Sequence, residues 1–324
     1  MNLEIFEGVK TPFYYYDKVL LERTLDTIEA FTSGTPMKVH YAIKANSEPE
    51  ILRIISSHGF GADCVSGNEI KIAIECGFRP ENIYYAGVGK TDEEILTGIE
   101  YGIGCFNIES LEEIEILSEL ASQKKKQMTV ALRVNPNIDA HTHEYITTGL
   151  KENKFGIDMR VLDEAVKKVT ESSWLDLGGL HFHIGSQITI NEPFKLLCER
   201  INDLQSKYKL DGIKFRFFNV GGGLGIDYES PDTNPIPDFA SYFDTILSNL
   251  HLEEGQEVHC ELGRAIVAQC GSLISKVVLV KKGIDKSFVI IDAGMSDLIR
   301  PALYGAHHKI ENISAEGKPS DNIY

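Results

Sequence analysis

Along most of the chain, short runs of β-forming residues alternate with longer stretches in which apolar residues recur every three or four positions. The longer stretches, such as EILRIISSHG and LEEIEILSEL, predict helices that bury one apolar face. The short runs are bounded by turn residues and predict buried strands. There are eight of them, at residues 39–44, 61–66, 83–87, 105–110, 129–135, 178–185, 215–222 and 258–264.

Cap signals mark the ends of several of these helices. A Ser or Thr followed three residues later by Glu is typical of a helix start, because the two side chains satisfy N–H groups that have no partner within the helix. Such pairs follow four of the strands and begin at Ser47, Ser66, Thr91 and Ser110. Glycines that can end a helix follow three of the helical stretches, at Gly59, Gly77 and Gly102. The repeated unit is therefore a strand, a turn and a capped helix.

Eight strand–helix units predict an α/β protein built on a (β/α)8 barrel of the TIM type. An open, doubly wound sheet is the competing architecture, because it also buries parallel strands on both faces.

Two regions lie outside the repeat. Residues 11–17 predict a strand, and residues 272–283 and 286–295 predict two more with no helix between them, which is typical of a hairpin or meander. We therefore expect three parts. These are an N-terminal strand and helix (1–36), the barrel (37–264) and the start of a C-terminal β-rich domain that the N-terminal strand joins (265–324).

Composition narrows the class of protein. The 324 residues are 43% hydrophobic and carry a net charge of −16, so we expect no binding to nucleic acid or to an anionic membrane surface. No apolar run approaches the roughly 18 residues of a membrane span, and the start, MNLEIFEGVK, lacks the pattern of a signal peptide. Six scattered cysteines without a C-x-x-C pair are typical of reduced thiols, which predicts a cytoplasmic protein.

Active sites of such barrels lie at the C-terminal ends of the strands, so the residues that end each run are candidates. The first run ends in Lys44, where burial would lower the pKa of the amine and favour a Schiff-base or general-base role, unless the side chain simply reaches solvent. The sixth run holds His181 and His183, two residues apart on one face of a strand. These two could bind zinc, stack on a planar cofactor or serve only the core.

The seventh run ends in Gly221, Gly222 and Gly223, whose backbone N–H groups could surround a phosphate, although neither a dinucleotide fingerprint nor a P-loop is present. The eighth ends in Glu261 and Arg264, which could bracket a ligand or pair with each other. One cofactor matches this combination of a lysine, a histidine ring, a glycine anion site and an acid with an arginine. Pyridoxal 5′-phosphate (PLP) has an aldehyde, a flat ring, a phosphate and a basic ring nitrogen.

The ordered motifs YAIKAN, GADCVSGNE, HFHIGSQ, NVGGGLG, ELGR and RPALY resemble those of the PLP-dependent decarboxylases with the alanine-racemase fold. The resemblance runs from about Thr11 to His308. The segments HTHEYITTGLKENKFGI (141–157) and DLIRPALYGAHH (297–308) are most similar to the diaminopimelate decarboxylases. The resemblance implies a carboxy-lyase that converts meso-2,6-diaminopimelate to L-lysine and CO₂, the last step of lysine biosynthesis. It also implies a homodimer with active sites shared between subunits, and no metal.

The resemblance further implies a role for each matching residue. Lys44, His183 and Glu261 would be catalytic: Lys44 would bind PLP covalently, His183 would stack on its ring and Glu261 would pair with the ring nitrogen. The other cofactor-binding positions would be Asp63, Ser186, Gly221, Gly222, Gly223, Gly263 and Arg264. The substrate carboxylate would be bound by Arg264, Arg300 and Tyr304.

The chain departs from the family pattern in two places. Leu262 stands where the family has the proline of its glutamate–proline–glycine–arginine motif. The family also continues to a Cys-Glu-Ser-x-Asp motif, whose cysteine is implied to donate a proton in the partner subunit's site. These 324 residues contain no such motif, and Cys260 and Cys270 stand in other contexts. We therefore expect either a fragment or a protein without this acid.

Three other interpretations stay open at this point. The chain could be another amino-acid or diamine decarboxylase of the same fold. It could be a non-catalytic PLP-binding protein, although a lone barrel would need neither the strands at 272–295 nor RPALY. It could also be a zinc hydrolase that uses His181 and His183.

Overall fold

The computed structural model describes residues 3–138 and 154–314. It divides into two compact units, which we call the barrel unit (22–226 and 236–267) and the β-unit (1–21, 227–235 and 268–324). The domain limits expected from the sequence, 36/37 and 264/265, stay predictions. No helix within the described residues is long and apolar enough to cross a membrane.

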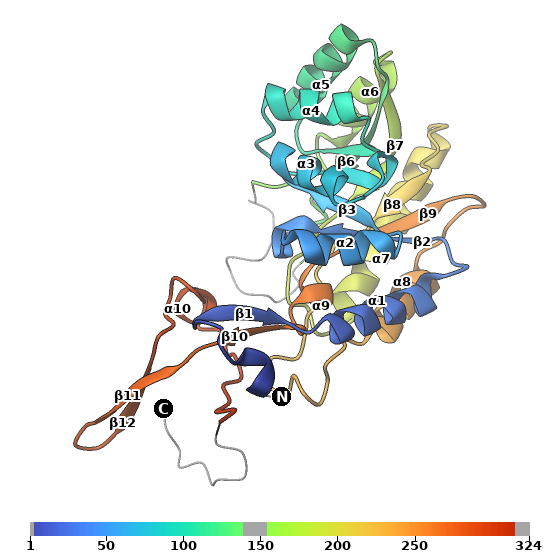
Figure 1. Ribbon diagram of the computed structural model, residues 1–324. Helices are drawn as coiled ribbons and strands as arrows, with labels where there is room; N and C mark the ends of the chain where they lie inside the picture. The colour runs from blue at the N-terminus through green and yellow to red at the C-terminus, as the bar shows by residue number, and fades with distance from the viewer. Residues whose placement is uncertain (1–2, 139–153, 315–324) are drawn as a thin grey trace. The chain divides into compact units, whose positions relative to one another are not determined.

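Eight parallel strands close into a barrel, which confirms the predicted TIM-like architecture over the open sheet (Figure 1). Closure depends on the pairing of the first strand with the last, in which His40 lies beside Glu261. The strands are β2 (Met37–Ala42), β3 (Gly61–Cys64), β4 (Ile83–Tyr85), β5 (Cys105–Ile108), β6 (Met128–Arg133), β7 (Leu175–His181), β8 (Phe217–Asn219) and β9 (Glu257–Leu262).

Amphipathic helices connect the strands and bury their apolar faces against the barrel, as the three-to-four-residue spacing predicts. The long helices are α1 (Lys18–Thr32), α2 (Pro49–Ser57), α3 (Gly67–Glu75), α4 (Asp92–Tyr101), α5 (Leu111–Lys124), α6 (Leu162–Glu171), α7 (Glu192–Leu210) and α8 (Phe239–Asn249). Shorter helices are α9 (Arg264–Val267), η1 (Leu3–Phe6), η2 (Ile43–Ala45) and η3 (Pro80–Asn82).

Three of the four predicted helix caps are present. The side chains of Ser66, Thr91 and Ser110 each accept a hydrogen bond from the N–H three residues on, and Thr91 with Glu94 forms the complete capping box. The prediction for Ser47 is wrong. Proline at the first position of α2 places the cap at Glu48, which makes no side-chain cap bond.

The barrel interior is packed with side chains rather than open. Toward the N-terminal ends of the strands, the rings of His40, Tyr84, Phe217 and His259 lie against one another, with centroids 4.3–5.6 Å apart. Glu261 follows His259 by two residues, so the next side chain of β9 on the same face of the strand is a carboxylate. The aromatic packing therefore fills one end of the barrel, and the candidate catalytic residues lie toward the other end.

The β-unit contains the N-terminal strand, as predicted. Strand β1 (Phe13–Tyr16) pairs antiparallel with β10 (Gly271–Ile274), and β11 (Val277–Lys282) pairs with β12 (Ser287–Ile291) as a hairpin (Figure 1). The run expected as one strand at 272–283 is thus two strands with different partners. A short helix, α10 (Arg300–Tyr304), follows the hairpin.

Candidate active site

The candidate residues of the barrel unit gather at one end of the barrel. Lys44 lies in η2 directly after β2, His183 follows β7, and Gly221–Gly223 follow β8. Glu261 lies near the end of β9, and Arg264 begins α9 just beyond it. Because the strands are parallel and closed, their C-terminal ends form a single rim, so these residues share one mouth.

Lys44 is paired with Asp63 of β3. The Nζ atom donates to Asp63 Oδ2 at 2.9 Å, and the lysine side chain is half exposed whereas the aspartate is fully buried. Burial acts to lower the pKa of Lys44, but the charges of Asp63 and Glu261 outweigh it and the pKa is raised. The expectation of a lowered pKa is therefore wrong, because the sequence did not reveal the nearby carboxylates of Asp63 and Glu261.

Asp63 shows the opposite balance. Burial, followed by repulsion from Glu261, raises the pKa of its carboxyl group to about 6, although Lys44 acts to lower it. Its second oxygen, Oδ1, has no hydrogen-bond partner within the described residues. Near neutral pH the pair is therefore an ion pair, with the proton on Lys44 and the charge on Asp63.

Glu261 is buried and surrounded by hydrogen-bond donors. Asn219 Nδ2 donates to Oε1 at 2.8 Å, Asn107 Nδ2 donates to the same oxygen at 3.4 Å, and His181 Nε2 lies 3.2 Å from Oε2. Burial alone would raise the pKa of this carboxyl group. The nearby His181, Lys44 and His183 outweigh burial and hold the pKa well below its usual range. Glu261 is therefore a buried anion.

His183 presents a neutral ring at the mouth. Burial, together with the nearby charges of Arg133 and Lys44, lowers its pKa to about 3. Its Nδ1 atom accepts the N–H of Gly222 at 3.2 Å, so the ring proton lies on Nε2. The same bond ties the imidazole to the glycine loop after β8.

The glycine loop packs so closely against neighbouring backbone that its glycines leave no room for side chains. Gly221 has a φ of +71°, and a Cβ there would stand 2.2 Å from the carbonyl oxygen of Phe182. A Cβ at Gly222 would stand 2.1 Å from the carbonyl oxygen of Glu261. Within the described residues the N–H of Gly223 has no acceptor, so it can bind a ligand. Nearby, Arg264 donates to Ser186 Oγ at 3.4 Å.

Sequence reasoning missed a second buried ion pair at the mouth. Arg133, the last residue of β6, donates to Glu109 at 2.7 Å, and both side chains are at most 9% exposed. Glu109 also accepts the N–H groups of Gly87 and Gly156. This carboxylate thus connects the chain segments that follow β4, β5 and β6, and the polar endings of the runs 105–110 and 129–135 were the available signal.

Comparison with known proteins identifies the family. Residues 20–268 match the family described as pyridoxal-dependent decarboxylase, pyridoxal binding domain. The diaminopimelate decarboxylase of Bacteroides thetaiotaomicron is 53% identical over 315 residues, which cover 97% of this chain and 82% of that protein. The chain belongs to the diaminopimelate decarboxylase family.

Solved structures of diaminopimelate decarboxylases have the same fold. The enzyme from Helicobacter pylori, complexed with L-lysine, superposes with a TM-score of 0.89 at 38% identity, covering 94% of this chain and 76% of that one. The M. jannaschii enzyme in complex with L-lysine has a TM-score of 0.84 at 34% identity, covering 95% and 73%.

The mouth of this diaminopimelate decarboxylase family member fits PLP on its own geometry. An amine lies beside a buried acid, a neutral imidazole lies beside the glycine loop, and a buried anion lies inside the barrel. The unbonded N–H of Gly223 in a loop too tight for a side chain suits a phosphate. PLP binding, expected from the residues, agrees with the family match.

Two predicted substrate residues of the family member lie in the β-unit. Arg300 begins α10, donates to His308 Nε2 at 3.0 Å and lies over the ring of Tyr228, 4.5 Å from its centroid. Tyr304 ends the same helix. Both roles stay predictions. Residues 141–153 of the segment that pointed to this family, His141 and His143 included, lie outside the described residues.

The zinc interpretation gains nothing from the geometry. His181 faces Glu261 and His183 faces Gly222. Within the described residues, the group of three or more His, Cys, Asp or Glu whose ligand atoms lie close together is Asp26, Glu29 and His58, at the surface.

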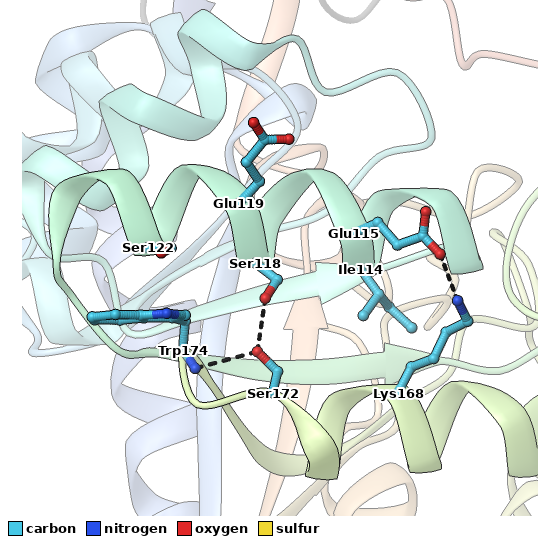
Figure 2. Close-up of a pocket in the computed structure, with 8 residues that line it drawn as sticks. All are labelled: Ile114, Glu115, Ser118, Glu119, Ser122, Lys168, Ser172 and Trp174. Carbon is cyan, nitrogen blue, oxygen red and sulfur yellow. Dashed lines mark hydrogen bonds and ion pairs between the residues drawn. The ribbon is translucent and has the colours of Figure 1, made fainter.

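Figure 2 shows a groove of the family member that is separate from the mouth. It lies between α5 and α6 and is lined by Ile114, Glu115, Ser118, Glu119, Ser122, Lys168, Ser172 and Trp174. Ser118 bonds Ser172, and Lys168 pairs with Glu115 across it. None of the candidate PLP residues borders this groove.

Proposed function

We propose that this chain removes CO₂ from meso-2,6-diaminopimelate to give L-lysine, with PLP held at the barrel mouth. The observation that carries the proposal is the Lys44–Asp63 pair facing buried Glu261 in a chain 53% identical to a diaminopimelate decarboxylase. In the reaction the bond between Cα and one carboxylate breaks, CO₂ leaves, and a proton takes its place. PLP, when bound, supplies the conjugated ring that accepts the electron pair of that bond.

Lys44 would hold the cofactor through its amine, and Asp63 would position that amine. The aspartate is fully buried on β3, so its 2.9 Å bond aims the more exposed lysine. Because its pKa is raised, the amine of Lys44 must lose a proton before its nitrogen can act as a nucleophile.

Glu261 and His183 would hold the ring. An anion inside the barrel favours a protonated ring nitrogen, and protonation makes the ring a better electron acceptor. The neutral imidazole of His183 would stack on the ring face, because its bond to Gly222 fixes the ring and its low pKa keeps it uncharged.

The phosphate would be bound by Ser186 and the glycine loop, with Gly263 and Arg264 beside them. Backbone N–H groups and a hydroxyl suit an anion, and Arg264 adds charge. A Cβ at Gly263 would stand 3.0 Å from Ala45 Cβ, so the small residue keeps this turn close to η2.

Substrate recognition is proposed for Arg264, Arg300 and Tyr304. Arginine binds a carboxylate with two parallel hydrogen bonds, which suits a substrate that carries one at each end. We further propose a homodimer whose subunits share active sites, and location in the cytoplasm, where the six buried free cysteines would stay reduced.

The test is an assay of CO₂ and lysine formation by the purified chain with PLP. Meso-diaminopimelate is compared with ornithine, arginine, L-lysine and carboxynorspermidine. The proposal predicts turnover of diaminopimelate at least ~100-fold above the others, a discrimination of about 2.7 kcal/mol, and no turnover by Lys44→Ala. Preference for another amino acid would support a different decarboxylase of this fold, and PLP binding without any turnover would support a non-catalytic role.

A further inference from the structure

Three buried donors from three strands converge on one carboxylate of the barrel. Asn107 comes from β5, His181 from β7 and Asn219 from β8, while their shared acceptor, Glu261, comes from β9. The four side chains are at most 5% exposed. Of these four side chains, the proposed function gives a role only to Glu261.

We propose that His181, supported by Asn107 and Asn219, is a positioning residue that keeps Glu261 ionised and aimed at the ring nitrogen of PLP. The inference rests on the role proposed above for Glu261 and extends it to a residue that has no contact role of its own in the reaction. Two geometric observations and one electrostatic effect support it.

The first is the nature of the groups facing Glu261. The N–H₂ ends of the two asparagines can only donate, and an ionised carboxylate can only accept. Asn219 cannot be flipped, because its Oδ1 already accepts the N–H of Gly221 at 2.9 Å. Protonation of Glu261 would set an O–H against these fixed donors, so the surroundings favour the anion.

The second is the orientation of the His181 ring. Its Nε2 lies 3.1 Å from one oxygen of Glu261 and 3.2 Å from the other, so it contacts both. Its Nδ1 is buried and has no partner within the described residues. The ring is therefore oriented through Glu261 alone among its polar contacts, and Nε2 must carry the hydrogen.

The third is electrostatic and agrees with the geometry. Burial acts to raise the pKa of Glu261, and His181 is the strongest of the influences that lower it, ahead of Lys44 and His183. Without His181, burial would count for more and Glu261 would take up a proton at a higher pH. A protonated Glu261 would no longer favour a proton on the ring nitrogen.

The test compares His181→Phe with His181→Gln. Phenylalanine fills the space without a donor, whereas glutamine can place an N–H₂ near the position of Nε2. His40→Phe is the matched control, because it also replaces a buried barrel histidine but one that bonds Asn82 and His259 instead of Glu261. PLP affinity of the cofactor-free protein is titrated from pH 5 to 9, and kcat and KM are measured at saturating PLP.

We expect His181→Phe to weaken PLP binding about 10- to 150-fold, because Glu261 would lose its charged hydrogen bond to the ring nitrogen, and such a bond contributes this range. The acid limb of the binding profile should move to higher pH, and kcat should fall while KM changes less than about twofold. His181→Gln should recover most of the affinity, and His40→Phe should bind PLP like the parent. Equal losses in both His181 variants, or no loss in His181→Phe, would overturn the inference.

Two further measurements separate the possible failures. If Glu261→Gln binds PLP and turns over normally, the role of Glu261 in the proposed function fails as well. If Glu261→Gln is impaired and a folded His181→Phe is not, only the inference on His181 fails. In the unmutated cofactor-free protein, nitrogen NMR of the histidine rings should find hydrogen on Nε2 of His181, and hydrogen on Nδ1 alone would contradict the inference even if the variants fold poorly.

Discussion

At the scale of single residues, the barrel mouth is governed by a few charges that burial forces to interact. Lys44 and Asp63 are 2.9 Å apart, and each shifts the pKa of the other against the effect of burial. Glu261 adds a second negative charge, which raises the pKa of both. The ionisation of this group of three is therefore a shared property, and a change at one residue is felt at the others.

Asp63→Asn tests that coupling. It removes the carboxylate that raises the pKa of Lys44 most, while burial continues to lower it, so the pKa of Lys44 should fall. Acylation of the cofactor-free protein at a series of pH values, followed by peptide mass analysis, measures the ionisation of Lys44 directly. The half-point should move to lower pH in the variant, with exposed Lys282 as an internal reference. An unchanged half-point would mean that Asp63 does not control Lys44.

Some residues of the mouth could be predicted from the sequence and others could not. Lys44, Glu261 and the glycines stand at strand ends with a chemistry that is unusual there. Asn107 and Asn219 lie within short strands, where one polar residue among apolar ones gives no indication of its partner. Their roles depend on which strands face each other across the barrel, and that is fixed only by closure.

At the scale of elements, local sequence determines most helix starts. The pattern of Ser or Thr followed by Glu predicts the helix start correctly at Ser66, Thr91 and Ser110, where N–H groups of the first turn need a partner. It fails at Ser47, because Pro49 has no N–H and moves the helix start to itself. The ends of strands are less local, since the run 272–283 is divided between two partner strands.

Thr91→Ala and Ser47→Ala are a matched pair of variants that tests which of these residues caps a helix. Removing the Thr91 hydroxyl takes away the cap of α4 and should reduce the free energy of unfolding by about 1 kcal/mol. Ser47→Ala should change it by less than about 0.5 kcal/mol, because Ser47 caps no helix. Urea unfolding of the two variants beside the parent provides the comparison. Equal losses would contradict the assignment of the caps.

At the scale of the whole molecule, eight repeated units predict the count of strands, but only the pairing of β2 with β9 distinguishes a barrel from an open sheet. That pairing places His40 inside the barrel beside β9. Burial, followed by the charge of His259, lowers the pKa of His40 to about 3. A buried histidine of this kind makes the stability of the fold depend on pH.

The direction in which stability changes with pH follows from which state, folded or unfolded, takes up the proton first. Between about pH 6.5 and 3 the unfolded chain protonates this histidine and the folded protein does not, so stability falls as the pH falls. Asp63 acts in the opposite direction, because its raised pKa lets the folded protein take up a proton first. Comparison of two proteins that both keep Asp63 isolates the histidine.

His40→Phe should therefore lose less stability than the parent between pH 7 and pH 5, by about 2 kcal/mol for one histidine with an ordinary unfolded pKa. The measurement is urea unfolding of the cofactor-free proteins at each pH. Phenylalanine keeps the ring packing against Tyr84 and His259. Parallel stability curves for the two proteins would show that His40 does not titrate on unfolding.

The central claim is that Lys44 holds PLP at the mouth of the barrel. The most direct measurement is borohydride reduction of the PLP-loaded protein, digestion, and mass analysis of every lysine peptide. The account predicts one PLP-derived mass addition, on the peptide that contains Lys44, and none in Lys44→Ala. Addition at another lysine, such as buried Lys90 with its pairing to Glu113, would contradict it.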